Sequence, residues 1–245
     1  MNKNTLSVIV LLFLSVGVQA QENHSPTVSV SSYVANRYLG FGTGSVFSKD
    51  PVAQSDVLVS FSDGVYVDLW DSRSLKGKWN SGSLGDEINY GIGWKGFLAP
   101  GLSLNASTMY FDMPKVFSFG TGDFIYSRAF LTKDLKLLSI VAGYENYITR
   151  SKNGPLSRNL WSFGVSKCLS FNSFSLRTSA LMINDGGTAG TDHGFFMRGR
   201  IGLDRNMNEH SVLNIIGINW YKPLTIHDKR KPNAMVYTGI TFNSK

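Results

Sequence analysis

Apolar and polar residues alternate along most of the chain, as they do in β-strands that have one apolar face and one small or polar face. The clearest case is residues 88–95, where Ile88, Tyr90, Ile92 and Trp94 alternate with small or polar side chains. Most of the alternating segments are roughly 9 to 12 residues long, close to what a tilted strand needs to cross a bilayer. The predicted strands are 27–38, 52–61, 64–71, 86–97, 102–112, 122–131, 135–147, 158–169, 173–183, 193–204, 210–221 and 234–243.

The links between the predicted strands alternate in length. After every second strand the chain turns back within a few residues, for example at Ser62-Asp63-Gly64 and at Ala99-Pro100-Gly101. Short turns at one rim and long loops at the other are typical of outer-membrane β-barrels, in which the short turns face the periplasm. The links after the odd-numbered strands are long and polar, for example 39–51, 72–85, 148–157, 184–192 and 222–233.

Alternation by itself also fits a soluble lipocalin-like barrel or a β-sandwich, because each has one dry face and one wet face. The lengths of the links favour the membrane barrel. The predicted fold is therefore all-β, an antiparallel transmembrane β-barrel of about twelve strands. A soluble periplasmic barrel is the alternative.

Aromatic residues near the ends of the predicted strands fit the girdles that membrane barrels place at the two interfaces of the bilayer. Core packing in a soluble β-protein is the competing interpretation. The residues concerned are Tyr33, Trp70, Trp94, Tyr110, Trp161, Trp220, Tyr221 and Phe242.

The first twenty residues have the three parts of a secretory signal peptide, with Lys3 in the positive region and residues 6–18 as the apolar region. The small residues of Val18-Gln19-Ala20 predict cleavage after Ala20. We expect residues 1–20 to be removed and residues 21–245 to form a single barrel domain. The expected location is the outer membrane of a Gram-negative bacterium.

Composition agrees with export and excludes two classes of protein. No long apolar run follows Ala20, which excludes a helical membrane protein. The formal net charge of +7 would ordinarily suggest nucleic acid, but an exported protein rarely meets any and no recognition motif accompanies the basic residues. The charge indicates attraction to acidic lipopolysaccharide or to a small anionic solute. The single cysteine, Cys168, has no partner for an internal disulfide.

Several short motifs between residues 31 and 114 resemble the TorF family, also labelled Gcw_chp, of bacterial outer-membrane proteins. The resemblance covers about a third of the chain. It implies an outer-membrane barrel and a role in transport. The motifs are Ser31-Ser32-Tyr33, Pro51-Val52-Ala53-Gln54, Gly64-Val65-Tyr66-Val67-Asp68-Leu69-Trp70, Glu87-Ile88-Asn89-Tyr90-Gly91 and Tyr110-Phe111-Asp112-Met113-Pro114.

The parity of the strands predicts charged residues in the lumen. If the apolar neighbours face lipid, Arg177, Arg198 and Arg200 point inward from two adjacent strands, and such a ladder of guanidinium groups favours anions. By the same parity Asp56 and Asp68 point inward from roughly the opposite wall, which would create a transverse field. The alternative is that these residues pair with each other and fill a closed barrel.

No catalytic, cofactor or metal site is predicted. His24, His193, His210 and His227 are the histidines that could activate a serine, and His210 and Ser211 are adjacent, but neighbouring residues of a strand point to opposite faces. The oxygen-rich stretch 184–192 lacks the spacing of a known calcium loop. The glycine-rich stretch 40–44 is predicted as a loop without the helix of a dinucleotide site.

The predicted function is a narrow channel or transporter for small anionic solutes. A structural or surface-interaction barrel without transport ranks second, and a lipid-active enzyme ranks third. A barrel of twelve strands lies between small barrels with packed interiors and large open ones, so the width of the lumen decides between the first two.

Overall fold

A computed structural model describes most of the chain, and the predicted signal peptide lies outside the described residues. The described residues contain strands and turns, and none of them forms a helix long and apolar enough to cross a membrane. The described ranges are 25–40, 44–76, 86–112, 124–151, 154–187, 194–225 and 231–244.

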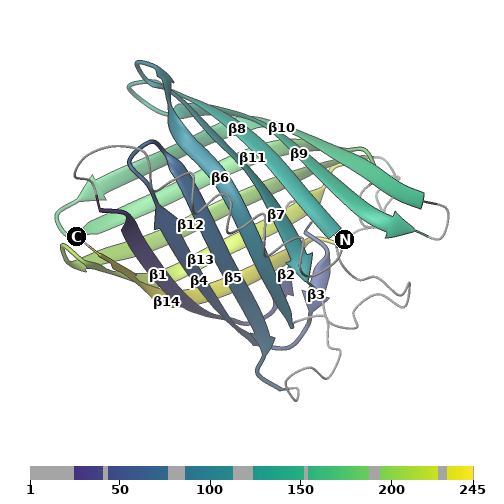
Figure 1. The fold of residues 1–245 in the computed structure, drawn as a ribbon, viewed down its shortest axis with the longest axis horizontal. Coiled ribbons are helices and arrows are strands. Elements are labelled where there is room, and N and C mark those ends of the chain that lie inside the picture. Colours follow the sequence, from purple (N-terminus) through teal and green to yellow (C-terminus); the bar gives the residue numbers. More distant parts are fainter. Residues whose placement is uncertain are drawn as a thin grey trace.

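Twelve of the strands form one closed antiparallel barrel, in which each strand pairs with its neighbours in the chain and β1 closes the ring between β14 and β4 (Figure 1). A separate pair, β2 and β3, lies between β1 and β4 in the sequence. The barrel strands are β1 (Thr27–Ala35), β4 (Val52–Ser60), β5 (Val65–Ser74), β6 (Glu87–Ala99), β7 (Leu102–Asp112), β8 (Phe124–Asp134), β9 (Ser139–Ser151), β10 (Gly154–Phe171), β11 (Phe174–Asp185), β12 (Gly194–Asn208), β13 (Ser211–Pro223) and β14 (Asn233–Asn243).

The sequence-based prediction of a twelve-stranded antiparallel barrel is confirmed, and two of the predicted long loops, 148–157 and 39–51, are wrong. The segment 148–157 was expected to be a loop, but β9 continues to Ser151 and β10 begins at Gly154, so both strands extend through it. The backbone ladder between β9 and β10 includes pairs such as Ile148 with Ser157. It therefore extends beyond the residues whose apolar alternation predicted the two strands. The two ends of the barrel are called the short-turn end, where β1 begins, and the long-loop end, where β1 ends.

The outer wall of the barrel is apolar and exposed, because alternate residues of each strand point outward. Val34, Trp161 and Phe163 expose 50%, 60% and 59% of their surfaces, which only a lipid or protein environment accommodates well over so many positions. Large apolar side chains in the barrel strands are therefore divided between an outer wall and an inner core.

Three of the predicted girdle aromatics point inward, which corrects the prediction for them. Trp70 is 8% exposed and packs in an inner cluster, Tyr221 packs against the same cluster, and the ring of Tyr33 contacts the inward ring of Tyr237 with centroids 5.7 Å apart. Trp70 shares the parity of Asp68, which was already expected to face inward. Trp161 and Phe242 remain on the outer wall, where they are 60% and 51% exposed.

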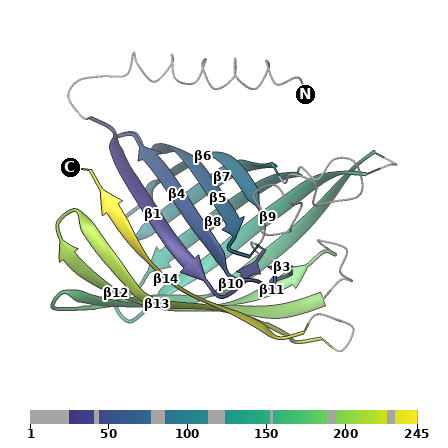
Figure 2. The same ribbon diagram turned by 90° about the horizontal axis from the view of Figure 1, so that it is seen from below.

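The predicted loop 39–51 contains the second correction, because it forms a small hairpin rather than an irregular loop. Strand β2 (Tyr38–Leu39) pairs with β3 (Val46–Ser48), and residues 41–43 between them lie outside the described part of the chain. Both views show β2 and β3 within the outline of the barrel near its long-loop end (Figures 1 and 2). Strands of two and three residues are too short to produce an alternation that sequence analysis detects.

Candidate functional site: the lumen

The lumen differs between its two ends. At the long-loop end, large aromatic and aliphatic side chains from every side of the barrel fill the interior. One cluster contains Phe111, Tyr126, Leu160, Ile183 and Phe196, each at most 2% exposed, and it packs against Phe47 of the inner hairpin. At the short-turn end many inward side chains are small or polar, and several of them, such as Ser31, Ser211 and Asn214, are also buried. The long-loop half is thus an apolar core, and the short-turn half is more polar.

The inner hairpin, defined as residues 38–40 and 44–48, crosses this core from wall to wall. Tyr38 is 1% exposed; its hydroxyl donates a 2.6 Å hydrogen bond to Oε1 of Glu87 on β6, and its ring lies 5.6 Å from that of Trp70 on β5. On the other side, Gly44 packs so tightly on Tyr221 of β13 that a Cβ there would overlap the phenol ring. The hairpin therefore contacts two nearly opposite walls.

A buried ion pair joins two strands of the barrel wall. Arg198 on β12 places Nη2 3.0 Å from Oε1 of Glu145 on β9, whose side chain is fully buried. Glu145 also accepts a hydrogen bond from the hydroxyl of Tyr126. Two strands, β10 and β11, lie between β9 and β12, so the pair spans part of the interior. Arg198 is inward as parity predicts, but its charge is compensated within the wall.

The other two predicted arginines also lie on the inner face, with different partners. Nε of Arg177 lies 2.6 Å from Oδ2 of Asp204, its diagonal neighbour on β12. Arg200 is exposed; its Nε donates a 3.0 Å hydrogen bond to the hydroxyl of Tyr237, and its guanidinium lies over that ring. Within the described part of the chain, Arg200 forms no ion pair. The three arginines therefore differ in how much of their charge remains uncompensated.

Asp56 and Asp68 occupy the inner face of β4 and β5, diagonally across the barrel from β11 and β12 in the ring of strands. They are diagonal neighbours whose carboxyl groups contact each other, because Asp68 pairs in register with Leu58 and Asp56 with Trp70. One oxygen atom of each is buried without a hydrogen bond to a described residue. The acidic pair and the arginines Arg177, Arg198 and Arg200 thus lie on different walls of the barrel.

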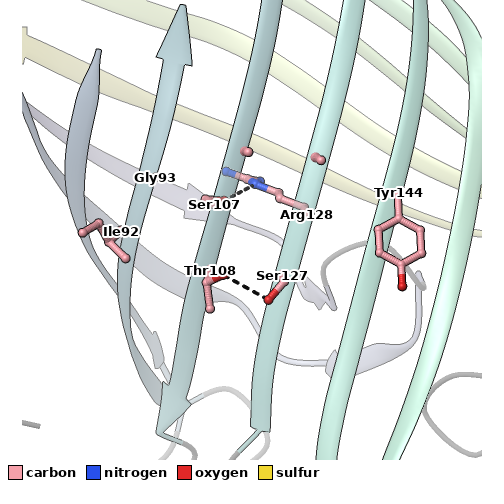
Figure 3. A pocket seen from close by; sticks show the side chains of 9 residues that line it. Ile92, Gly93, Ser107, Thr108, Ser127, Arg128 and Tyr144 are labelled. Carbon is pink, nitrogen blue, oxygen red and sulfur yellow. Dashed lines mark hydrogen bonds between the residues drawn. The ribbon is translucent and has the colours of Figure 1, made fainter. Parts of the chain in front are cut away.

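Sequence analysis missed a further lumenal cation, Arg128 on β8. Its Nε donates a 2.9 Å hydrogen bond to the hydroxyl of Ser107 on β7 (Figure 3). The next residues along these strands, Thr108 and Ser127, share a 3.0 Å hydrogen bond and belong to the opposite face of the wall. Tyr126 and Phe130 share the parity of Arg128 and pack inside the barrel. The rule that apolar residues face lipid would therefore turn Arg128 outward, which is why sequence analysis missed it. Glu145 and Asp204, the partners of Arg198 and Arg177, were missed too.

Of the residues considered for catalysis, His210 and Ser211 are described, and they contact different partners. The imidazole of His210 contacts Glu209 at 3.1 Å, whereas the hydroxyl of Ser211 donates to Asn208. His24, His193 and His227 lie outside the described residues, as does most of 184–192. Among the residues that the structure describes, no group of three His, Cys, Asp or Glu side chains could hold a metal ion.

Comparison with known proteins shows the fold. No model of a protein family and no curated protein matches the chain. The solved structure of the NanC porin is similar over 89% of this chain and 99% of that chain, with 9% identity and a TM-score of 0.54. The KdgM porin is similar over 88% of this chain and 98% of that chain, with 6% identity and a TM-score of 0.54. A KdgM structure in complex with disordered oligogalacturonate has 5% identity and a TM-score of 0.52.

These likenesses, together with the closed ring of twelve strands, define the class of protein. The chain is a β-barrel with the architecture of outer-membrane porins. At such low identities the shared property is the arrangement of strands. The chemistry of the lumen belongs to this chain's own residues.

Proposed function

We propose that this protein is an outer-membrane channel that admits small anionic solutes into its lumen. The observation that carries the proposal is Arg200, an exposed guanidinium on the inner wall that is held in place by the neutral hydroxyl of Tyr237. A guanidinium is permanently charged, and its planar set of donors fits carboxylate and phosphate groups. Since a neutral partner leaves that charge uncompensated, Arg200 is the residue best suited to attract an anion.

The other charges of the lumen refine the proposal. Arg198 and Arg177 are paired with Glu145 and Asp204, so they contribute less to the field than three unpaired arginines would. Asp56 and Asp68 lie across the lumen from Arg200 and oppose its field there. We therefore expect a modest preference for anions rather than a strict one, with negative solute groups passing along the arginine wall.

The porins of similar fold support the same class of solute. One KdgM structure is described as a complex with disordered oligogalacturonate, which is an acidic sugar chain. That ligand belongs to KdgM, and we carry over only the class of small anionic solute. Outer-membrane lipid and lipopolysaccharide are the proposed surroundings of the apolar outer wall. Membership of the TorF family also stays a proposal, supported by the motifs between residues 31 and 114.

A structural barrel without transport is the second candidate. The packed aromatic core at the long-loop end favours it, because a permanently filled interior conducts nothing. A lipid-active enzyme ranks below both, since His210 and Ser211 contact different partners. Catalysis therefore has no proposed residues.

Reversal potentials in planar bilayers under a potassium chloride gradient test the proposal. Wild-type protein should favour chloride over potassium, and Arg200→Gln should reduce that preference. Arg205→Gln is the matched control: Arg205 lies on the same strand near the short-turn end, with its guanidinium over the ring of Phe174. A preference for potassium in the wild type, or equal effects of the two substitutions, would contradict the proposal.

A further inference from the structure

The inner hairpin closes the long-loop end of the lumen, and the way it is attached differs from the way the wall is built. Barrel strands are joined by continuous ladders of backbone hydrogen bonds along both edges. The hairpin has its own two-strand ladder, with Tyr38 paired to Ser48 and Leu39 to Val46, and no barrel strand belongs to that sheet. Its contacts with the wall are therefore mainly those of side chains.

These side-chain contacts come from Tyr38, Leu39, Val46 and Phe47, which pack into the apolar clusters of the interior. The rings of Tyr38 and Phe47 meet edge to face, with centroids 5.3 Å apart, and they pack between Trp70 and the aromatic cluster of the wall. The hydroxyl of Tyr38 reaches Glu87, which also accepts a 2.9 Å hydrogen bond from Asn89. Glu87 thus keeps one strong partner on its own strand when the hairpin leaves, while its other oxygen already lacks a partner among the described residues.

The barrel also remains closed without the hairpin. Strands β1 and β4 pair directly from Thr27 with Ser60 to Ala35 with Val52, so the ring does not depend on residues 37–50. Asn36 continues the connection to β14 through the carbonyl oxygen of Val236. Displacing the hairpin would therefore expose its aromatic contacts and leave every barrel ladder in place.

We propose that the inner hairpin is a gate: its displacement from between Glu87 and Tyr221 opens the lumen, and the hydrogen bond from Tyr38 to Glu87 is the latch that holds it shut. This inference rests on the proposed channel function and names how that channel is closed. The contacts that support it are those of residues 38–40 and 44–48. Loss of the buried hydrogen bond between Tyr38 and Glu87 weakens the attachment of the hairpin, and this shifts the balance from the closed state toward the open one.

The latch is tested by single-channel recording with a matched pair of variants. Tyr38→Phe removes the hydroxyl that reaches Glu87 and should raise the fraction of time spent open several-fold. Tyr144→Phe also removes a tyrosine hydroxyl, one that donates a 2.9 Å hydrogen bond to Asn159 on the outer face of the wall, away from the hairpin. It should leave the open fraction at the wild-type value. Equal open fractions in the two variants would overturn the latch.

Two further variants test the gate itself. Replacing residues 37–50 by a short Gly–Ser turn should give a folded barrel that conducts continuously. Gly44→Cys with Tyr221→Cys, in a Cys168→Ser background, joins the hairpin to the wall. The oxidised protein should be silent, and the same sample should regain openings after reduction, which controls for strain at either position.

The outcomes separate the gate from the channel. A conducting hairpin-deleted barrel together with a silent oxidised protein would support both. If the oxidised protein conducts as well as the hairpin-deleted one, the gate is wrong and the channel stands. If the hairpin-deleted barrel is folded and silent, no path lies beneath the hairpin, and both the gate and the channel function fail.

Discussion

The hydroxyl of Tyr38, on the inner hairpin, donates a 2.6 Å hydrogen bond to Oε1 of Glu87, on the barrel wall, and both side chains are about 1% exposed. This contact joins the segment that fills the lumen to the wall that surrounds it. A buried hydroxyl and a buried carboxyl group depend strongly on each other, because neither can turn to water instead.

Removing the acceptor of this bond should destabilise the folded protein. Glu87→Ala leaves the hydroxyl of Tyr38 and the amide of Asn89 without their shared partner, and we expect a loss of about 1–3 kcal/mol in the free energy of unfolding. Glu87→Gln keeps a carbonyl oxygen in the same place and should lose less. Urea titrations of the barrel in detergent micelles would measure both. Equal losses would show that the acceptor oxygen is not what matters.

The ion pair between Arg198 and Glu145 should be sensitive to the loss of one partner. Arg198→Leu leaves the fully buried carboxylate of Glu145 uncompensated and should cost about 3–5 kcal/mol. Arg198→Leu combined with Glu145→Leu should recover most of that loss, because apolar side chains then fill the space. The same urea titrations apply. A double variant as unstable as the single one would contradict this account.

Gly199 and Gly202 on β12 test packing on the two faces of the wall, because by strand parity Gly199 lies on the outer face and Gly202, like Arg200, on the inner face. A Cβ on Gly199 would overlap the indole of Trp220, whereas a Cβ on Gly202 meets no atom within 4 Å. Gly199→Ala should therefore destabilise the barrel by about 1–3 kcal/mol, and Gly202→Ala should have little effect. Adding Trp220→Ala should remove the penalty at position 199. The temperature at which each protein loses its folded band on SDS gels would rank the wild type, the two single variants and the double variant.

Neutralising the acidic wall should strengthen the preference for anions. Asp56→Asn with Asp68→Asn removes the negative charge that this contacting carboxyl pair sets against Arg200, and it should move the reversal potential further toward that of chloride. Asp71→Asn is the control, since Asp71 lies on β5 with the opposite parity and is paired with Arg73. A shift toward potassium in the double variant would show that the acidic residues do not face the solute path.

The sequence predicted the barrel well because the strand signal is local. Alternation locates a strand from its own residues, and the lengths of the links then order the strands around the ring. Parity also places Arg177, Arg198 and Arg200 on the inner face. Their partners are another matter, because Arg198 meets Glu145 only through the accumulated register of four strands, which alternation does not determine.

The inner hairpin shows the other limit of sequence analysis. Residues 39–51 were predicted as an exposed loop, yet Leu39 is 4% exposed and Phe47 packs against both inner clusters. Two signals relate to this burial. The link contains the apolar Leu39, Val46 and Phe47, and the φ of 67° at Gly44 and its contact with Tyr221 require a residue without a side chain. Neither signal says which cavity receives the segment.

The central claim is that this chain is a barrel inserted in the outer membrane, and cell fractionation tests it most directly. The mature protein should sediment with the outer membrane and leave it only with detergent, because its outer wall exposes apolar residues around the whole ring. Recovery of the folded protein in the osmotic-shock fraction, without detergent, would contradict the membrane barrel and favour a soluble periplasmic one.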